Sequence, residues 1–261
     1  MTVVTPVRTE KDGPVTIVIL DRPATRNAVD RETADLLREA FEDFEADPAQ
    51  QVAVLYGDGG TFCSGADLKT MDQRLEPDGP GPMGPTRLRL SKPVIAAIEG
   101  YAVAGGLELA VWCDLRVAAT DAAFGVFSRR WGVPLIDGGT VRLPRLVGTG
   151  RALDLILTGR EIGAVEAERI GLVNWVVDTG TALKEALSVA WLLVGLPQDC
   201  LRNDRQSVLA NEGVDIDQAI RQEFRFGLES LASGEAARGA ARFADGAGRG
   251  GAADVVDEED A

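Results

Sequence analysis

A single glutamate, Glu108, interrupts the otherwise apolar run VAGGLELAVW, where it follows two glycines. The run predicts a helix over residues 105–112 whose faces are small or apolar apart from this carboxylate. Burial in such surroundings raises the pKa of a carboxylate towards neutrality, where it can act as a general base. A glutamate in the first helical turn can also be explained by the helix dipole alone. The residue types leave both interpretations open.

Histidine is absent from the 261-residue sequence, which narrows the chemistry considerably. The absence excludes His-based catalytic triads, histidine general bases and the usual zinc sites. Proton transfer near pH 7 then falls mainly to a carboxylate, a perturbed Lys or Cys, a Tyr or an ordered water. The sequence also lacks GxxxxGK[ST] and a GxGxxG leading into a helix, which disfavours Walker and Rossmann nucleotide sites.

Two glycine-containing junctions, TFCSGADL (61–68) and GYAVAGGLEL (100–109), each follow an expected strand. Small side chains allow a ligand to approach backbone N–H groups, and a helix N-terminus leaves such groups without internal partners. If the two junctions face each other, two amides can hold a developing oxyanion. The alternative is that these glycines only permit tight turns.

The elements that must position these residues alternate between strand and helix in the first two thirds of the chain. The remainder is mainly helical, which predicts an α/β core with a helical C-terminal extension. Residues 76–85 are rich in Pro and Gly and predict a flexible loop. Expected strands cover 15–20, 52–57, 93–100, 115–119 and 173–178; expected helices cover 31–47, 105–112, 152–158, 164–170, 181–194, 203–211, 216–231 and 235–243.

The formal net charge of −14 argues against a nucleic-acid partner, because phosphate neutralisation needs a basic surface. Part of this charge lies in a Gly/Ala tail that ends in DEEDA and is expected to be mobile. No run is long and apolar enough to predict a membrane span, and no signal peptide is recognised. The three cysteines are unclustered, which fits a reducing compartment and predicts a cytoplasmic protein.

The segments FCSGADL and YAVAGGLELAVWCDLRVA, followed by FG and GGTVRLPRLVG, resemble the crotonase (enoyl-CoA hydratase/isomerase) superfamily. The resemblance covers about residues 15–245 and implies a spiral of ββα units followed by helices that pack into homotrimers, often two per hexamer. It divides the chain into a crotonase-like core at 1–195, a helical region at 196–245 and a tail at 246–261. It implies an acyl-CoA thioester substrate, with coenzyme A as part of the substrate and no separate cofactor or metal.

The same resemblance assigns roles to individual positions. The thioester oxygen is expected between the backbone amides of Ala66 and Gly105, and Glu108 matches the first catalytic glutamate of the family. Geometry supports this pairing, because residues 105 and 108 lie on one face of a helix. The residues expected to line the substrate site are Ala24, Arg26, Ala28, Ser64, Ala66, Asp67, Leu68, Gly105 and Ser128.

One family feature is missing. The hydratases carry a second glutamate twenty positions after the first, and here that position holds Ser128, which cannot donate a proton near neutrality without a base. Asp137 lies nearby, at a position where other branches of the superfamily place a catalytic aspartate. An aspartate in front of GGTVRL is also a good helix N-cap, so this carboxylate has a structural alternative.

We therefore expect an enoyl-CoA hydratase in which Glu108 activates water, with Asp137 or the water itself completing protonation at C2. Two alternatives stay open. The first is an enoyl- or dienoyl-CoA isomerase that uses Glu108 and Asp137 as a proton shuttle. The second is a catalytically degenerate protein that only binds acyl-CoA.

Overall fold

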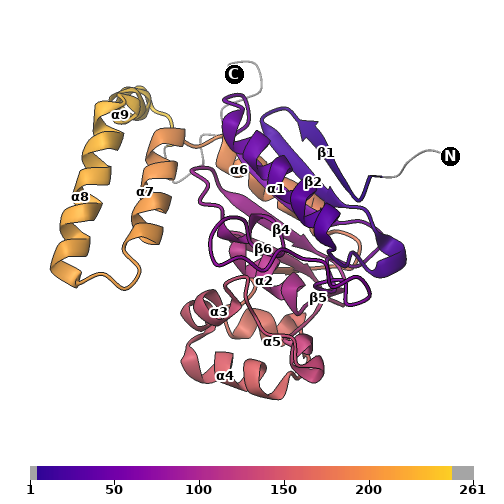
Figure 1. Ribbon diagram of the computed structural model, residues 1–261. Coiled ribbons are helices and arrows are strands. Elements are labelled where there is room, and N and C mark those ends of the chain that lie inside the picture. The colour runs from indigo at the N-terminus through magenta and orange to yellow at the C-terminus, as the bar shows by residue number, and fades with distance from the viewer. Residues whose placement is uncertain (1–4, 249–261) are drawn as a thin grey trace. The chain divides into compact units, whose positions relative to one another are not determined.

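In the computed structural model, which describes residues 5–248, six strands form one sheet in the order β1-β2-β3-β4-β6-β9 (Figure 1). Within this sheet β1 pairs antiparallel with β2, and each following pair is parallel. The strands are β1 (Val7–Asp12), β2 (Val15–Leu20), β3 (Val52–Gly57), β4 (Val94–Ile98), β6 (Leu115–Ala119) and β9 (Trp175–Val177).

The central strands consist mainly of Val, Ile, Leu and Ala because both faces of the sheet are covered. Every residue of β2 and of β4 is buried, as expected for parallel strands with elements packed on both sides. The strands predicted at 15–20, 52–57 and 115–119 are confirmed with these bounds.

A second, three-stranded sheet in the order β5-β7-β8 carries one of the glycine junctions. Its strands are β5 (Tyr101–Val103), β7 (Ala123–Gly125) and β8 (Ile162–Gly163). The chain passes from β4 in the first sheet to β5 in the second at Gly100, which has a φ of +53°. A side chain at this glycine would lie 2.4 Å from the carbonyl oxygen of Gly60, so the crossing requires a residue without Cβ.

Helices pack against these sheets through apolar faces. In α1 the buried residues include Leu37, Phe41 and Phe44 at helical spacing, and the ring of Phe41 meets Trp112 of α2 edge to face at 4.8 Å. The helices of this part are α1 (Arg31–Ala46), α2 (Gly105–Trp112), α3 (Gly139–Val147), α4 (Thr149–Thr158), α5 (Ala164–Arg169) and α6 (Ala182–Val194), and the 3-10 turns are η1 (Pro23–Thr25), η2 (Pro85–Arg87) and η3 (Phe127–Trp131).

The described chain divides into two compact units. One contains the residues up to Leu90 and Val94–Ala190, and the other contains Ser91–Pro93 and the residues from Trp191 onward. The second unit holds α7 (Gln198–Ala210), α8 (Ile216–Ala232) and α9 (Glu235–Asp245). The predicted domain boundary after residue 195 stays a prediction, and most of the expected acidic tail, residues 249–261, lies outside the described residues.

The Pro/Gly-rich segment 76–85 differs in part from the expected flexible loop. Residues 76–79 are exposed, but residues 81–86 are all buried, with a bridge between Gly81 and Gly84 and the turn η2 directly after it. The expectation was wrong for this second half because its partners come from Asp137, far away in the sequence.

Candidate active site

Glu108 lies in α2 with only 2% of its surface exposed. One of its carboxylate oxygens, Oε1, accepts the backbone N–H of Asp137 at 2.9 Å and that of Gly139 at 2.8 Å. Burial, and after it the charge of Asp137, raise the pKa of this carboxyl to about 7 against the opposing effect of the two N–H groups and of Arg142. A carboxyl with this pKa exists in both protonation states at neutral pH, as a general base requires.

The helix that carries Glu108 depends on close packing at its first turn. Gly106 lies so near the first junction that a Cβ there would be 2.1 Å from the carbonyl oxygen of Cys63. Ala104, which precedes the helix, has a φ of +53°, an unusual conformation for a residue with a side chain. The second glycine of the GG pair is thus explained by contact between the two junctions.

Asp137 is also buried, and its side chain is used differently from a helix cap. Its Oδ1 accepts the backbone N–H of Met83 at 2.9 Å and the hydroxyl of Thr86. The residue that caps α3 is Gly138, and α3 has no side-chain cap, so the N-cap alternative for Asp137 is excluded. Burial raises the pKa of the Asp137 carboxyl above its ordinary value, against the opposing effect of the Thr86 and Met83 hydrogen bonds.

The two glycine junctions lie side by side. Cys63 and Ala102 form a parallel bridge, in which the N–H of Cys63 donates to Tyr101 at 2.9 Å. A Cβ on Gly65 would lie 3.0 Å from the backbone nitrogen of Gly105. Across residues 5–248, neither the N–H of Ala66 nor that of Gly105 has a hydrogen-bond acceptor. Two main-chain donors without an acceptor among the described residues therefore lie on adjoining junctions, one of them at the start of the helix that carries Glu108.

Met83 is a residue of the candidate site that sequence reasoning did not identify. Its side chain is buried, and its Sδ would lie 2.7 Å from a Cβ placed on Gly105. Met83 also donates its backbone N–H to Asp137, so it connects the second carboxylate with the second junction. An apolar residue between glycines and prolines gave no signal, because its neighbours in space are distant in sequence.

Ser128, at the position of the missing glutamate, lies in η3 and is buried. Its Oγ is one of the few buried polar side-chain atoms within the described residues that lack a hydrogen-bond partner. The structure shows no hydrogen bond between this hydroxyl and either carboxylate of the site. No group within residues 5–248 therefore forms a hydrogen bond through which this hydroxyl could exchange a proton.

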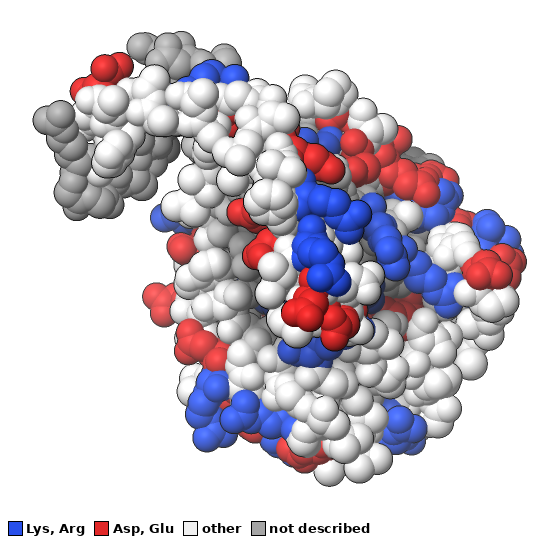
Figure 2. Space-filling model, turned by 90° about the vertical axis from the view of Figure 1, so that its left-hand side faces the viewer, with Lys and Arg blue, Asp and Glu red and all other residues white. Residues whose placement is uncertain are grey.

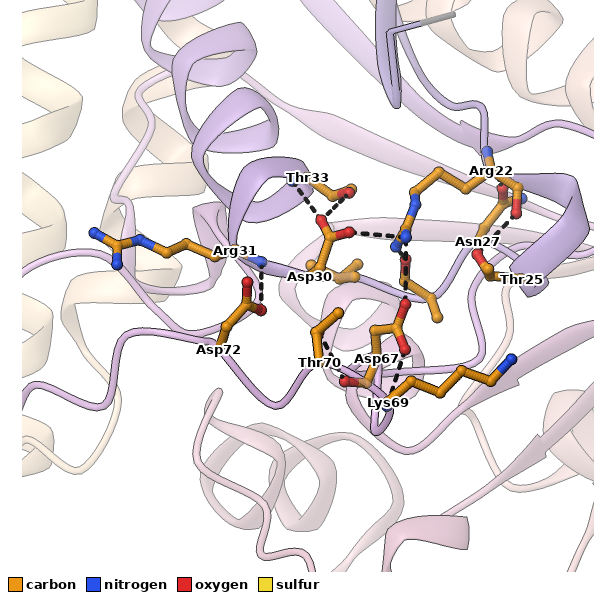
Figure 3. A network of polar contacts seen from close by, with 12 residues as sticks. Arg22, Thr25, Asn27, Asp30, Arg31, Thr33, Asp67, Lys69, Thr70 and Asp72 are labelled. Carbon is orange, nitrogen blue, oxygen red and sulfur yellow. Dashed lines mark hydrogen bonds and ion pairs between the residues drawn. The ribbon is translucent and has the colours of Figure 1, made fainter.

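The remaining predicted substrate-site residues lie on two neighbouring loops, residues 22–30 and 61–72. The N–H of Ser64 donates to Arg26 at 3.1 Å, and Asn27 donates its side-chain amide to the carbonyl oxygens of Asp58 and Thr61. Figure 3 shows further polar contacts between these two loops, around Arg22, Asp30 and Asp67. Ala24, Arg26 and Leu68 are exposed on them, Ala28 and Asp67 are buried, and Ser64 is partly buried.

Comparison with known proteins identifies the family. The Enoyl-CoA hydratase/isomerase family matches residues 10–245. The chain is 36% identical over 245 residues to the enoyl-CoA hydratase EchA19 of Mycobacterium tuberculosis, covering 90% of this chain and 92% of that protein. The protein belongs to this family. It is also 38% identical over 229 residues to a crotonyl-CoA hydratase of Syntrophomonas wolfei, covering 84% and 87% of the two chains.

The fold expected from the resemblance is confirmed by a solved structure. The crystal structure of the enoyl-CoA hydratase EchA1 from Mycobacterium marinum superposes with a TM-score of 0.88 at 33% identity, covering 93% of this chain and 96% of that one. The protein is thus an acyl-CoA enzyme of the enoyl-CoA hydratase/isomerase family, with the α/β crotonase fold, two mixed sheets and C-terminal helices.

Coenzyme A is polyanionic, so this acidic family member needs local positive charge. Figure 2 shows basic side chains in a band across the centre of one face, with acidic side chains beside them. A groove of about 410 Å³ is lined by Arg38, Arg74 and Arg87 together with Glu42. Arg38 is paired with Glu42, and Arg74 lies 3.2 Å from Asp35, so this positive charge is partly neutralised.

Two further features concern membranes and metals. None of the helices within residues 5–248 is both long enough and apolar enough to cross a bilayer. In the same part of the chain, no three Cys, Asp or Glu side chains lie together in a way that could hold a metal ion.

Proposed function

We propose that this family member is an enoyl-CoA hydratase that adds water across the C2=C3 bond of a 2-enoyl-CoA. The observation that carries the proposal is the position of Glu108, a buried carboxylate with a pKa of about 7, on the helix whose first N–H has no acceptor among residues 5–248. The hydratase names of EchA19 and of the crotonyl-CoA hydratase support the same reaction.

The two oxygens of the Glu108 carboxylate have different surroundings and therefore different functions. Its Oε1 is held by two backbone N–H groups, and no hydrogen bond to Oε2 is found among the described residues. Oε2 is therefore the atom that takes a proton from water while the water oxygen bonds to C3. The electron pair of the C2=C3 bond moves through C2 towards the thioester oxygen.

The negative charge that develops on the thioester oxygen is stabilised by the N–H groups of Ala66 and Gly105. Loss of one such donor in known enzymes reduces kcat by about 10²–10³-fold. C2 then takes a proton from the protonated Glu108, which returns the proton of the water, or from Asp137. Ser128 takes no part as an acid, since its hydroxyl lacks a base.

Glu108→Gln tests the assignment, because it keeps the hydrogen-bond acceptor but removes the base. We expect enzyme-dependent loss of enoyl-CoA absorbance in the wild type and its collapse in this variant. Glu99→Gln is the matched control: Glu99 is also buried and also accepts two backbone N–H groups, from Gly180 just before α6 and from Ala182 at its first residue. Equal turnover by wild type and Glu108→Gln would refute the role of Glu108.

A second candidate reaction is double-bond isomerisation of an enoyl- or dienoyl-CoA. It is favoured by the proximity of the two buried carboxyls, since the charge of Asp137 contributes to the raised pKa of Glu108. Such a shuttle would exchange deuterium at C2 and at C4 or C6 without adding water. If Asp137→Asn exchanges as fast as the wild type, isomerisation through this pair is excluded. Tight acyl-CoA binding without turnover of any thioester would instead indicate the degenerate, binding-only alternative.

We further propose that the protein acts in the cytoplasm as a homotrimer or a hexamer of two trimers. The helix α8 supports self-association, because large apolar side chains at helical spacing are exposed on it. These residues are Ile216, Ile220, Phe224, Leu228 and Leu231. Native mass spectrometry measures the state directly, and a monomer at micromolar concentration would contradict the proposal.

A further inference from the structure

The guanidinium of Arg22 connects the two loops that hold the first oxyanion donor. Its Nη2 lies 2.8 Å from Oδ2 of Asp30 and 3.2 Å from Oδ2 of Asp67, as Figure 3 shows. Its Nη1 donates to the carbonyl oxygen of Ala28. The Arg22 side chain is only 19% exposed, and those of Asp30 and Asp67 are 17% and 8% exposed, so water screens these contacts little.

These partners of Arg22 surround the bridge between Val29 and Ala66. The N–H of Val29 donates to Gly65 at 2.8 Å, and the N–H of Asp67 donates to Val29 at 2.8 Å. In this parallel pairing Val29 bonds to the residues on either side of Ala66, so the N–H of Ala66 itself is not used. Ala28 and Asp30 flank Val29, and Asp67 follows Ala66. One guanidinium therefore binds both sides of the bridge from which the Ala66 N–H projects.

Both carboxylates that hold Arg22 are themselves oriented by other groups. Asp30 accepts the N–H of Thr33 at 2.9 Å and its hydroxyl at 2.7 Å, which fixes it at the start of α1. Asp67 accepts the N–H of Lys69 at 3.1 Å (Figure 3). Without Arg22, two poorly solvated carboxylates would face each other across the bridge and repel. The repulsion would separate the 22–30 loop from the 61–72 loop.

Such a separation would alter the oxyanion geometry because the donors are close together. The Cβ position of Gly65 is 3.0 Å from the nitrogen of Gly105, so little free space lies between this loop and the start of α2. A displacement of residues 65–67 changes the distance and angle between the N–H groups of Ala66 and Gly105.

We propose that Arg22 is a positioning residue that holds the Ala66 N–H in line with the Gly105 N–H through its contacts with Asp30, Asp67 and Ala28. The inference rests on the proposed function, in which these two amides bind the thioester oxygen. The guanidinium of Arg22 is occupied by Asp30, Asp67 and the carbonyl oxygen of Ala28, so we assign it no contact with the reacting atoms. It acts through the loop that presents the donor.

Arg22→Met and Arg22→Lys test the proposal. Arg160→Met is the matched control, because Arg160 also joins two carboxylates, those of Asp154 and Glu166, at 2.7 and 2.6 Å. In Arg22→Met we expect kcat to fall by about tenfold to hundredfold, the cost of a misplaced group, with a much smaller change in KM. Arg22→Lys retains the charge but not the two terminal nitrogens of the guanidinium, so an intermediate loss of kcat is expected.

A spectroscopic measurement separates positioning from general stability. Stronger hydrogen bonding to a carbonyl lowers its stretching frequency, so the infrared band of a bound, isotope-labelled acyl-CoA thioester reports the two donors. We expect a lowered frequency in the wild type and in Arg160→Met, and a smaller lowering in Arg22→Met. Should Arg22→Met fail to fold, Asp67→Asn removes one of the two ion pairs with little change of shape. We expect this variant, too, to lower the carbonyl frequency less than the wild type does.

The outcomes are distinguishable. Suppose that the wild type lowers the carbonyl frequency and that Arg22→Met, or Asp67→Asn in its place, lowers it equally and has an unchanged kcat. The positioning role of Arg22 is then wrong, while the proposed function stands. If the wild type binds acyl-CoA without lowering the frequency, no oxyanion site exists, and both proposals fail.

Discussion

The backbone N–H of Asp137 donates to Oε1 of Glu108 over 2.9 Å, while the side chain of Asp137 turns away to Met83 and Thr86. One residue thus fixes the orientation of Glu108, the general base of the proposed reaction, and brings a second carboxyl into the same buried region. The like charge of Asp137 adds to the effect of burial on the pKa of Glu108. In the proposed reaction, this relationship gives a protein without histidine a carboxyl whose pKa suits a base near neutral pH.

The pH dependence of hydration follows from the pKa of Glu108. Water activation requires the ionised form, so kcat/KM should rise with pH and reach half its maximum near pH 7. Initial rates between pH 5 and 9, with an enoyl-CoA that is stable over this range, measure the profile. A rate that stays constant from pH 5 upward would show that another group, or none, takes the proton.

Replacement of Asp137 should move that profile. Asp137→Asn removes the like charge beside Glu108, so the pKa of Glu108 falls and the acidic limb shifts to lower pH. The same variant separates the two roles of Asp137, because retained hydration at pH 8 means that Glu108 itself returns the proton to C2. An acidic limb that does not move would contradict the electrostatic coupling between the two carboxyls.

Glu108 should also cost stability at the pH where it is active. Its pKa is raised from 4.5 to about 7 in the folded protein, so between these values the folded state binds more protons than the unfolded state. The contribution of this carboxyl to the stability of the folded state is fully present below pH 4.5 and is lost as the pH rises through 7.

Glu108→Gln, which cannot ionise, should therefore be more stable than the wild type at pH 8, by up to about 3 kcal/mol. At pH 4.5 the two proteins should have similar free energies of unfolding. Urea denaturation at both pH values gives the two differences. A gap that does not widen between pH 4.5 and 8 would show that the carboxyl is not shifted as described.

Space at Gly105 provides a steric test of the second donor. In Gly105→Ala the new methyl group would lie 2.7 Å from Sδ of Met83, so either this side chain or the start of α2 must move. We expect kcat to fall at least about tenfold, because displacement of the helix start misplaces the N–H of residue 105.

The matched control for this change is Gly150→Ala, since no atom lies within 4 Å of the added Cβ at this helical position. Adding Met83→Ala to Gly105→Ala removes the obstructing side chain and should restore part of the rate. A double variant as slow as Gly105→Ala alone would mean that Met83 is not the cause.

The sequence could predict the elements whose signal is local. The β-branched run VTIVIL predicts β2 with its bounds, and the apolar run behind two glycines predicts α2 with its bounds. The strands β5, β7 and β8 have two or three residues each, too few for any periodicity, and they were missed.

The candidate site could be predicted only as far as its residues form motifs. Glu108, Ala66 and Gly105 stand within recognisable segments, and the structure brings those segments together. The orientation of Asp137 could not be predicted, because its partners Met83 and Thr86 precede it by 54 and 51 residues. The role of Arg22 was likewise hidden, since its partners become neighbours only when the 22–30 and 61–72 loops meet.

The most direct test of the central claim, that Glu108 activates water towards a thioester held by two backbone amides, is a single incubation in heavy water. A chain-length series of 2-enoyl-CoAs is mixed with the wild type or with Glu108→Gln, and the masses of the products are measured by mass spectrometry. The account predicts that the wild type adds one D₂O to at least one substrate, with deuterium at C2, and that Glu108→Gln adds none. Deuterium exchange without gain of oxygen, or equal hydration by both proteins, would contradict it.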